Sequence, residues 1–263
     1  MARIVTHSGI CLPHAARARQ ALFAADADHP ALANHRRSGG AVCGVRGGHL
    51  LLGDDDLGAV DGMPLTFGGS AAHNVQNVAA AALAAQGLGL SLSAIRSTLA
   101  RFGLSPLDNP GRLERWTHRG ATVLLDYAHN PDGLAQLLHV ARALEPRRLG
   151  LLLGQAGNRD DAAVAALAAT AAAARPDRVV VKELPAMLRG RALGEIPALL
   201  QRGLQAAGLA GPAFARIDDE EAAALALLAW AQPGDVLVLP VHTASVRRAL
   251  QDFLVGPGAA PRR

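Results

Sequence analysis

The second half of the chain alternates short apolar runs with longer amphipathic segments. The apolar runs predict buried strands at Ala121–Leu125, Leu149–Leu153, Arg178–Val181 and Val236–Leu239. The amphipathic segments predict helices at Pro131–Leu144, Arg159–Ala174, Gly194–Ala207, Asp219–Ala231 and Ser245–Leu254. Apolar strands that alternate with helices are typical of a mostly parallel sheet covered by helices on both faces, the α/β class. Right-handed crossovers place the carboxyl ends of such strands on one edge, where ligands bind.

The first half of the chain has a weaker pattern. The first twenty residues show no clear period. Ala41–Val45 and His49–Leu52 flank a glycine-containing turn, which predicts a β-hairpin. We expect the acidic run Asp54–Asp56 to be a solvated turn rather than a metal site.

Two helices and a break follow. One helix is predicted from His73 to about Gln86, and a second runs from Ser91 or Ser93 to Phe102. Two prolines within Leu104–Pro110 then interrupt the chain. We therefore place a domain boundary between residues 110 and 111, giving domains 1–110 and 111–263.

Composition narrows the class of partner. Lys182 is the only lysine among 26 basic residues, and the formal net charge is +4. The arginines are scattered and largely balanced by acidic residues, so we expect no nucleic-acid partner; a mildly basic protein also suits anionic ligands such as phosphates. Cys11 and Cys43 have no metal or redox spacing. Ala162–Ala174 and Ala222–Trp230 are shorter than the ~18 residues of a membrane span, so we expect a soluble cytoplasmic protein.

Unusual residues gather where the predicted strands end. Asp126 and His129 lie in the loop before Pro131, where they can meet a ligand, although Asp126 and Asn130 could equally cap the following helix. The next loops are Gly154–Asp160, Lys182–Arg191 and Pro240–Thr243. Arg189 and Arg191 could bind a carboxylate, but taken alone they are more typical of a solvated turn. His242 could be an ordinary loop histidine.

Several motifs occur together in a family order. They are Pro64–Gly69, His73–Ala81, Asn109–Glu114 and the string Asp126-Tyr127-Ala128-His129-Asn130-Pro131. In this combination the chain resembles the Mur ligase superfamily. Lys182-Glu183 with Leu188–Arg191 makes it most similar to the C-terminal half of the cyanophycin synthetases.

The resemblance implies a fold and an activity. It implies a Rossmann-like C-terminal domain over 111–263, preceded by a partial α/β central ligase domain over 1–110. The family joins a carboxylate to an amine with ATP and Mg²⁺ through an acyl-phosphate, a reaction that needs positive charge around the transferring phosphoryl group. The implied partners are ATP, an amino acid and an acyl acceptor.

The resemblance also implies residue roles. Asn77 resembles the asparagine that contacts adenine, and Arg112 the linker arginine that reaches the ATP phosphates. Asp126 resembles the residue that holds the ribose, with His129 and Asn130 beside the nucleotide. Arg112 and Asp126 are the catalytic candidates. The candidates for the incoming amino acid are Asn158, Arg159, Lys182, Arg189 and Arg191.

Some family features have no counterpart in this chain. The phosphate-binding pattern G-x-x-x-x-G-K-[ST] is absent, because the only lysine, Lys182, is followed by Glu183. No lysine precedes residue 182 to be carbamylated, and no carboxylate-rich segment is assignable to Mg²⁺. Three hypotheses therefore stay open: a ligase, a non-catalytic nucleotide- or amino-acid-binding remnant, or one subunit of a split ligase whose separate ATPase half supplies the loop. Self-association is a further expectation. All rest on the four strand-end loops converging on one cleft that faces the helix of Asn77.

Overall fold

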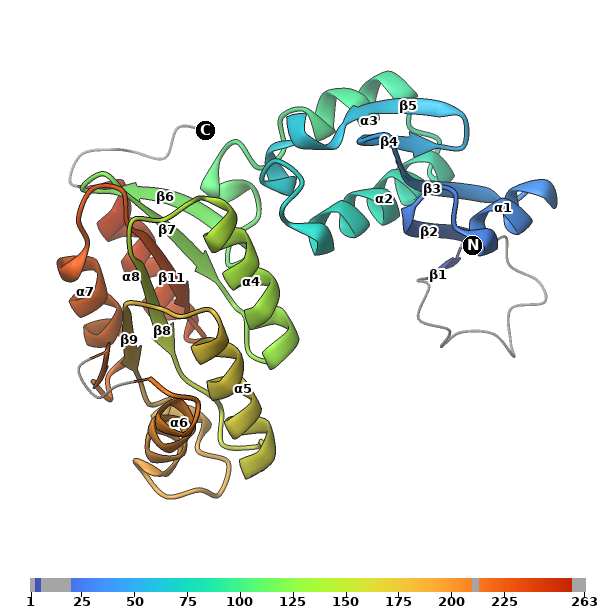
Figure 1. Ribbon diagram of the computed structural model, residues 1–263. Coiled ribbons are helices and arrows are strands. Elements are labelled where there is room, and N and C mark those ends of the chain that lie inside the picture. The colour runs from blue at the N-terminus through green and yellow to red at the C-terminus, as the bar shows by residue number, and fades with distance from the viewer. Residues whose placement is uncertain (1–2, 6–19, 210–212, 257–263) are drawn as a thin grey trace. The chain divides into compact units, whose positions relative to one another are not determined.

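The computed structural model describes residues 3–5, 20–209 and 213–256, and within them the chain forms two compact units, residues 1–108 and 109–263 (Figure 1). The division lies two residues before the boundary expected from the sequence. Of the two cysteines, Cys43 is buried, and Cys11 lies outside the described residues.

The first unit is built on a five-stranded sheet with the order β1-β2-β3-β4-β5. The strands are β1 (Arg3–Val5), β2 (Gln20–Asp26), β3 (Ala41–Arg46), β4 (His49–Leu52) and β5 (Asp55–Ala59). The helices are α1 (Pro30–Arg37), α2 (Ala72–Gly87) and α3 (Leu92–Leu99), with 3-10 turns at η1 (Val60–Gly62), η2 (Pro64–Thr66) and η3 (Pro106–Asp108). β1, β2 and β3 are parallel, and β4 and β5 continue antiparallel.

The predicted hairpin is confirmed as β3 and β4, with Arg46 opposite His49 and both turn glycines, Gly47 and Gly48, at positive φ. The acidic run is solvated as expected, although only its start is a turn, because Asp55 and Asp56 begin β5. The sequence pattern missed β2 and α1. The helix α1 is short and strongly polar, with Leu32 as its only buried residue, so it carries little periodic signal.

The second unit contains a six-stranded sheet with the order β10-β9-β8-β11-β7-β6. Its strands are β6 (Glu114–His118), β7 (Ala121–Asp126), β8 (Leu149–Leu153), β9 (Arg178–Val181), β10 (Phe214–Arg216) and β11 (Val236–Pro240). All neighbours are parallel except β6 and β7. The predicted mostly parallel α/β sheet is confirmed, and the carboxyl ends of its parallel strands β7, β8, β9, β10 and β11 share one edge.

Helices cover both faces of this sheet. They are α4 (Pro131–Ala143), α5 (Asp161–Ala173), α6 (Glu195–Ala206), α7 (Glu220–Trp230) and α8 (Ala244–Val255), with a 3-10 turn, η4, at Pro185–Met187. α4, α5 and α6 lie side by side on one face, and α7 and α8 cover the other (Figure 1). Val123 and Leu125 pack with α7 and α8, whereas Leu124 points to the opposite face and is also fully buried. The sheet therefore has a core on each side.

Two details differ from the prediction for this unit. The helix expected from Arg159 begins at Asp161, because the Asp160 carboxylate caps it by accepting a hydrogen bond from the Ala163 N–H at 2.8 Å. The strands β6 and β10 were not predicted. β6 alternates buried and exposed residues at the sheet edge, and β10 has only three residues, so neither forms an apolar run.

Candidate functional site

Four loops meet at the carboxyl edge of the second sheet. The Val241 N–H donates to the Asp126 carbonyl oxygen at 2.8 Å, which joins the loops after β11 and β7. The Gly157 N–H donates to the Met187 carbonyl oxygen at 2.8 Å, which joins the loops after β8 and β9. The side chain of Lys182 lies against Gly154, leaving no room for a Cβ there. The loops that begin at Asp126, Gly154, Lys182 and Pro240 therefore meet within this unit, and that they form a cleft facing the helix of Asn77 stays a prediction.

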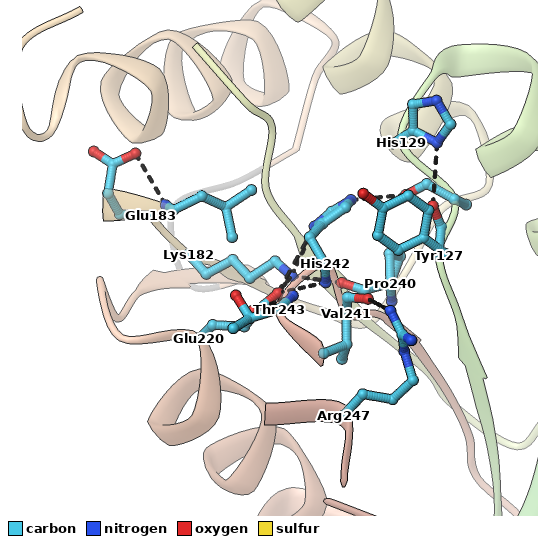
Figure 2. A network of polar contacts seen from close by, with 12 residues as sticks. Tyr127, His129, Lys182, Glu183, Glu220, Pro240, Val241, His242, Thr243 and Arg247 are labelled. Carbon is cyan, nitrogen blue, oxygen red and sulfur yellow. Dashed lines mark hydrogen bonds and ion pairs between the residues drawn. The ribbon is translucent and has the colours of Figure 1, made fainter. Parts of the chain in front are cut away.

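Lys182 lies at the centre of a buried polar network (Figure 2). Its ammonium group forms an ion pair with Glu220, which begins α7. It also donates to the Pro240 carbonyl oxygen at 2.5 Å and contacts Nδ1 of His242 at 3.2 Å. These three acceptors use all three donors of the ammonium group. Complete burial lowers the pKa of Lys182 to about 8, against the opposing charge of Glu220, so Lys182 is mostly charged at neutral pH.

Glu220 is the anion that this network requires. Its carboxylate accepts hydrogen bonds from the backbone N–H groups of His242 and Thr243, at 2.8 and 3.0 Å, besides the contact with Lys182. Burial pushes the pKa of Glu220 upward, but the hydrogen bonds from His242 and Lys182 outweigh it and hold the pKa well below its usual range. The ionised carboxylate of Glu220 therefore holds the loop after β11 through the backbone N–H groups of His242 and Thr243.

His242 connects this network to the loop after β7. A lysine ammonium can only donate, so Nδ1 of His242 accepts and Nε2 carries the proton. Nε2 then donates to the Ala128 carbonyl oxygen at 3.1 Å. Burial, helped by the charge of Lys182, lowers the pKa of His242, consistent with this neutral tautomer. The path from Lys182 through His242 to Ala128 is thus continuous.

Asp126 ends β7 and holds the start of its loop. Its carboxylate accepts a hydrogen bond from the Leu113 N–H at 2.6 Å. Burial raises its pKa, opposed by hydrogen bonds from the Leu113 and Ala128 backbones and by the charge of Arg112. The cap of α4 is Asn130, whose Oδ1 accepts from the Gly133 N–H at 2.7 Å. Of the two capping candidates, only Asn130 caps the helix.

Tyr127 is surrounded by cationic and imidazole groups. The guanidinium carbons of Arg112 and Arg247 lie 5.6 and 5.5 Å from its ring centroid. The rings of His129 and His242 lie 5.5 and 5.4 Å away, centroid to centroid. His129 also contacts the Tyr127 carbonyl oxygen through Nδ1 at 3.2 Å. Arg112, Asp126 and His129, predicted from the sequence, therefore lie around a single loop.

The residues expected to hold the incoming amino acid divide into two groups. Asn158, Arg159 and Arg189 are exposed. Arg191 instead forms ion pairs with Asp161 and Glu195 and donates to the carbonyl oxygens of Gly157 and Arg159.

One of those expectations needs correction. Lys182 has no exposed surface, and its donors are all used within the protein. Arg191 is committed to tying two loops together. In this conformation Lys182 is not available to a substrate, because protein acceptors use all of its donors, whereas the side chain of Arg191 stays partly exposed.

Asn77 belongs to the first unit. It is exposed on α2, and its Nδ2 donates to Oδ1 of Asn74 at 3.3 Å. Asn74 in turn is buried and donates to the Leu65 carbonyl oxygen at 2.9 Å. The side chain of Asn77 therefore stands on the surface of its own helix.

Glu220 and Arg247 were not singled out from the sequence, and Tyr127 and His242 were named there without a role. The signal for the buried network was a lone lysine directly after the apolar strand β9, because a charge at that position needs a partner. The identity of the partner was not readable, since Glu220 is 38 residues away in the chain.

Among residues 3–5, 20–209 and 213–256, no group of three or more His, Cys, Asp or Glu side chains is placed to hold a metal ion. Within the same residues no helix combines the length and apolarity needed to cross a bilayer.

Comparison with known families decides the class of the second unit. A family model described as Mur ligase, glutamate ligase domain, matches residues 111–240. This part of the chain is a Mur ligase C-terminal domain. The match begins at the glycine before Arg112 and includes Asp126, His129 and Lys182.

Curated relatives of this Mur ligase domain extend beyond it. The chain is 32% identical to cyanophycin synthetase of Synechocystis sp. over 72% of its length, and 30% identical to that of Crocosphaera subtropica over 89%. It spans only 22% and 27% of those two proteins. A diaminopimelate-adding UDP-N-acetylmuramoyl-L-alanyl-D-glutamate ligase of Corynebacterium efficiens is 30% identical over 67% of the chain and 33% of that protein.

Solved structures share the fold of the chain. A bifunctional folylpolyglutamate synthase/dihydrofolate synthase of Yersinia pestis matches with a TM-score of 0.56 at 19% identity, covering 88% of this chain and 52% of that one. A folylpolyglutamate synthase of Thermotoga maritima matches with a TM-score of 0.55 at 18% identity, covering 91% and 55%. The chain therefore shares the α/β fold of these two enzymes.

Proposed function

We propose that the chain is part of an ATP-dependent acid–amino acid ligase and that its Mur ligase C-terminal domain binds the nucleotide at the loop Asp126–Asn130. The observation that carries the proposal is the placement of Arg112, Asp126 and His129 around that loop, at the edge of a parallel sheet where ligands bind. An ATP-consuming ligase works where ATP is abundant, so we expect the cytoplasm.

The proposed roles follow from the chemistry of each group. The Asp126 carboxylate has acceptor capacity beyond its bond to the Leu113 N–H, and ribose hydroxyls are donors that it can accept. Arg112 is exposed and forms no ion pair among the described residues, which leaves its guanidinium available for phosphate oxygens. Exposed Arg159 and Arg189 are the remaining candidates to hold the carboxylate of the incoming amino acid.

The proposed reaction proceeds in two steps. A substrate carboxylate oxygen attacks the γ-phosphorus of ATP, and ADP leaves as the acyl-phosphate forms. The amine of the amino acid then attacks the acyl carbon, phosphate leaves, and the amine proton is lost as the amide forms. Negative charge accumulates on phosphate oxygens in the first step, so Arg112 acts there by electrostatic stabilisation.

Calorimetric titration with ATP tests nucleotide binding. We expect measurable affinity for the purified 263-residue chain. Arg112→Ala and Asp126→Ala should each weaken it by about tenfold, the value of one charge-assisted hydrogen bond. The matched controls are Arg115→Ala on β6 and Asp252→Ala on α8, both exposed. Equal ATP affinity of all four variants and the wild type would defeat the proposal.

A second reading, that this chain binds nucleotide without catalysis, is favoured by the missing phosphate-binding loop. We expect no amino-acid-dependent release of ADP from the purified chain, because no G-K-[ST] sequence is present to hold the phosphates. Turnover by the purified chain would contradict this. Turnover that appears only after a second chain carrying such a loop is added would support a split ligase.

A further inference from the structure

Arg247, in the first turns of α8, has an unusual environment for a charged side chain. One terminal nitrogen, Nη2, donates to the Val241 carbonyl oxygen at 3.2 Å. Its Nε is buried and has no hydrogen-bond partner. Among the described residues no carboxylate lies within ion-pair distance of it. A buried donor without an acceptor is costly, so such a group calls for a ligand.

A second arginine lies close to the first. Arg112 and Arg247 both approach the ring of Tyr127, and an added Cβ on Gly111 would stand 2.9 Å from Nη1 of Arg247. Arg247 therefore contacts the backbone next to Arg112, and glycine at 111 makes that approach feasible. Figure 2 shows the Arg247 side chain reaching from α8 toward Tyr127.

The tyrosine ring only partly compensates this concentration of charge. A cation over an aromatic face is attracted to the ring quadrupole, but the ring carries no net charge. The carboxylate that acts on Arg112 is Asp126, which also accepts the Leu113 N–H. Two forked guanidinium groups with one partly used carboxylate nearby make a site that favours an oxyanion.

We propose that Arg247 is a second cation of the site and that, together with Arg112, it binds an oxyanion of a polyphosphate. The shared chemistry is a phosphate group, which belongs either to a nucleotide or to a free polyphosphate. The inference rests on the proposed nucleotide function only for the first source. In that case Asp126 takes the ribose while the two arginines take the phosphates.

The single tyrosine of the chain provides a direct probe. Protein labelled with 3-fluorotyrosine should give one ¹⁹F resonance, from residue 127. We expect tripolyphosphate to shift this resonance with saturation, and Arg247→Gln to weaken the affinity at least fivefold. Arg248→Gln removes the same charge from the neighbouring exposed position and should leave the affinity within twofold of the wild type.

Equal tripolyphosphate affinity of Arg247→Gln, Arg248→Gln and the wild type would overturn the inference. If Arg247→Gln does not fold, Arg247→Lys decides, because it keeps the charge but loses the fork. Affinity below the wild type then supports the inference, and wild-type affinity contradicts it.

ATP and adenosine separate this inference from the proposed function. If Asp126→Ala weakens the binding of ATP but Arg247→Gln does not, the nucleotide function stands and the role of Arg247 falls. The opposite outcome is that Arg247→Gln weakens the binding of tripolyphosphate, while ATP binds no tighter than tripolyphosphate and adenosine does not bind. In that case the oxyanion site stands and the nucleotide function falls.

Discussion

Lys182, directly after β9, and Glu220, at the start of α7, form an ion pair in which both side chains are buried. Through His242 the pair also connects to the loop after β11 and to the Ala128 carbonyl oxygen. The side chain expected to bind substrate thus supports the loops that surround the site. Removing one partner of such a buried ion pair strongly destabilises a protein, even where the intact pair adds little net stability.

Glu220→Gln should lower the free energy of unfolding by roughly 3 kcal/mol, because it leaves the Lys182 charge buried without its anion. Glu221→Gln is the matched control, since both glutamates lie in the first turn of α7 and interact alike with the helix dipole. The control should cost less than about 0.5 kcal/mol. Denaturant unfolding of both variants measures the difference, and equal costs would show that the buried pair is not the cause.

The cost of Glu220→Gln should depend on pH. The pKa of Glu220 is held below its usual 4.5 in the folded chain, so the stability that its ionisation contributes is present above pH 4.5 and is lost as the pH falls below it. The gap in unfolding free energy between wild type and Glu220→Gln should therefore narrow on acidification. Chemical unfolding at several pH values tests this. A gap that stays constant down to pH 3 would contradict the assignment.

Asp126→Asn should stabilise the fold at neutral pH and weaken the binding of ATP. Burial raises the pKa of Asp126, so the folded state loses stability as the pH rises through that value and the carboxyl ionises. Asparagine cannot ionise, so the variant should have a higher free energy of unfolding than the wild type at pH 7. This difference in unfolding free energy should vanish below pH 3.8. A variant less stable than the wild type at pH 7 would show that Asp126 serves the fold rather than a ligand.

Gly157→Ala should separate the loops after β8 and β9. A Cβ at residue 157 would stand 1.9 Å from the Leu188 carbonyl oxygen, so the backbone must shift, at a cost of roughly 1–3 kcal/mol. At Gly62 a Cβ would meet nothing within 4 Å, so Gly62→Ala is the control. Thermal unfolding compares the two. A Gly157→Ala protein as stable as the control would mean that the two loops are not held together.

Much of the second unit could be predicted from the sequence, because its central strands are uninterrupted apolar runs and Asn130 with Pro131 marks a helix start. The edge strands β6 and β10 could not, since β6 alternates buried and exposed residues and β10 has only three residues. For the site, the order of strands and loops predicts that the loops after β7, β8, β9 and β11 meet at one edge, whereas Arg112 was assigned to the site by the family resemblance alone. That order does not reveal that Lys182 is buried or that Arg191 pairs with Asp161 and Glu195, because the partners of a charge depend on tertiary contacts such as the one between Lys182 and Glu220.

The most direct test of the central claim compares the affinity of the chain for ATP and for 2′,3′-dideoxy-ATP, measured by calorimetry in the wild type and in Asp126→Ala. If the Asp126 carboxylate holds the ribose, removing the ribose hydroxyls should weaken binding to the wild type by about tenfold and leave binding to Asp126→Ala unchanged. Equal affinity of the wild type for the two nucleotides would contradict the proposed site.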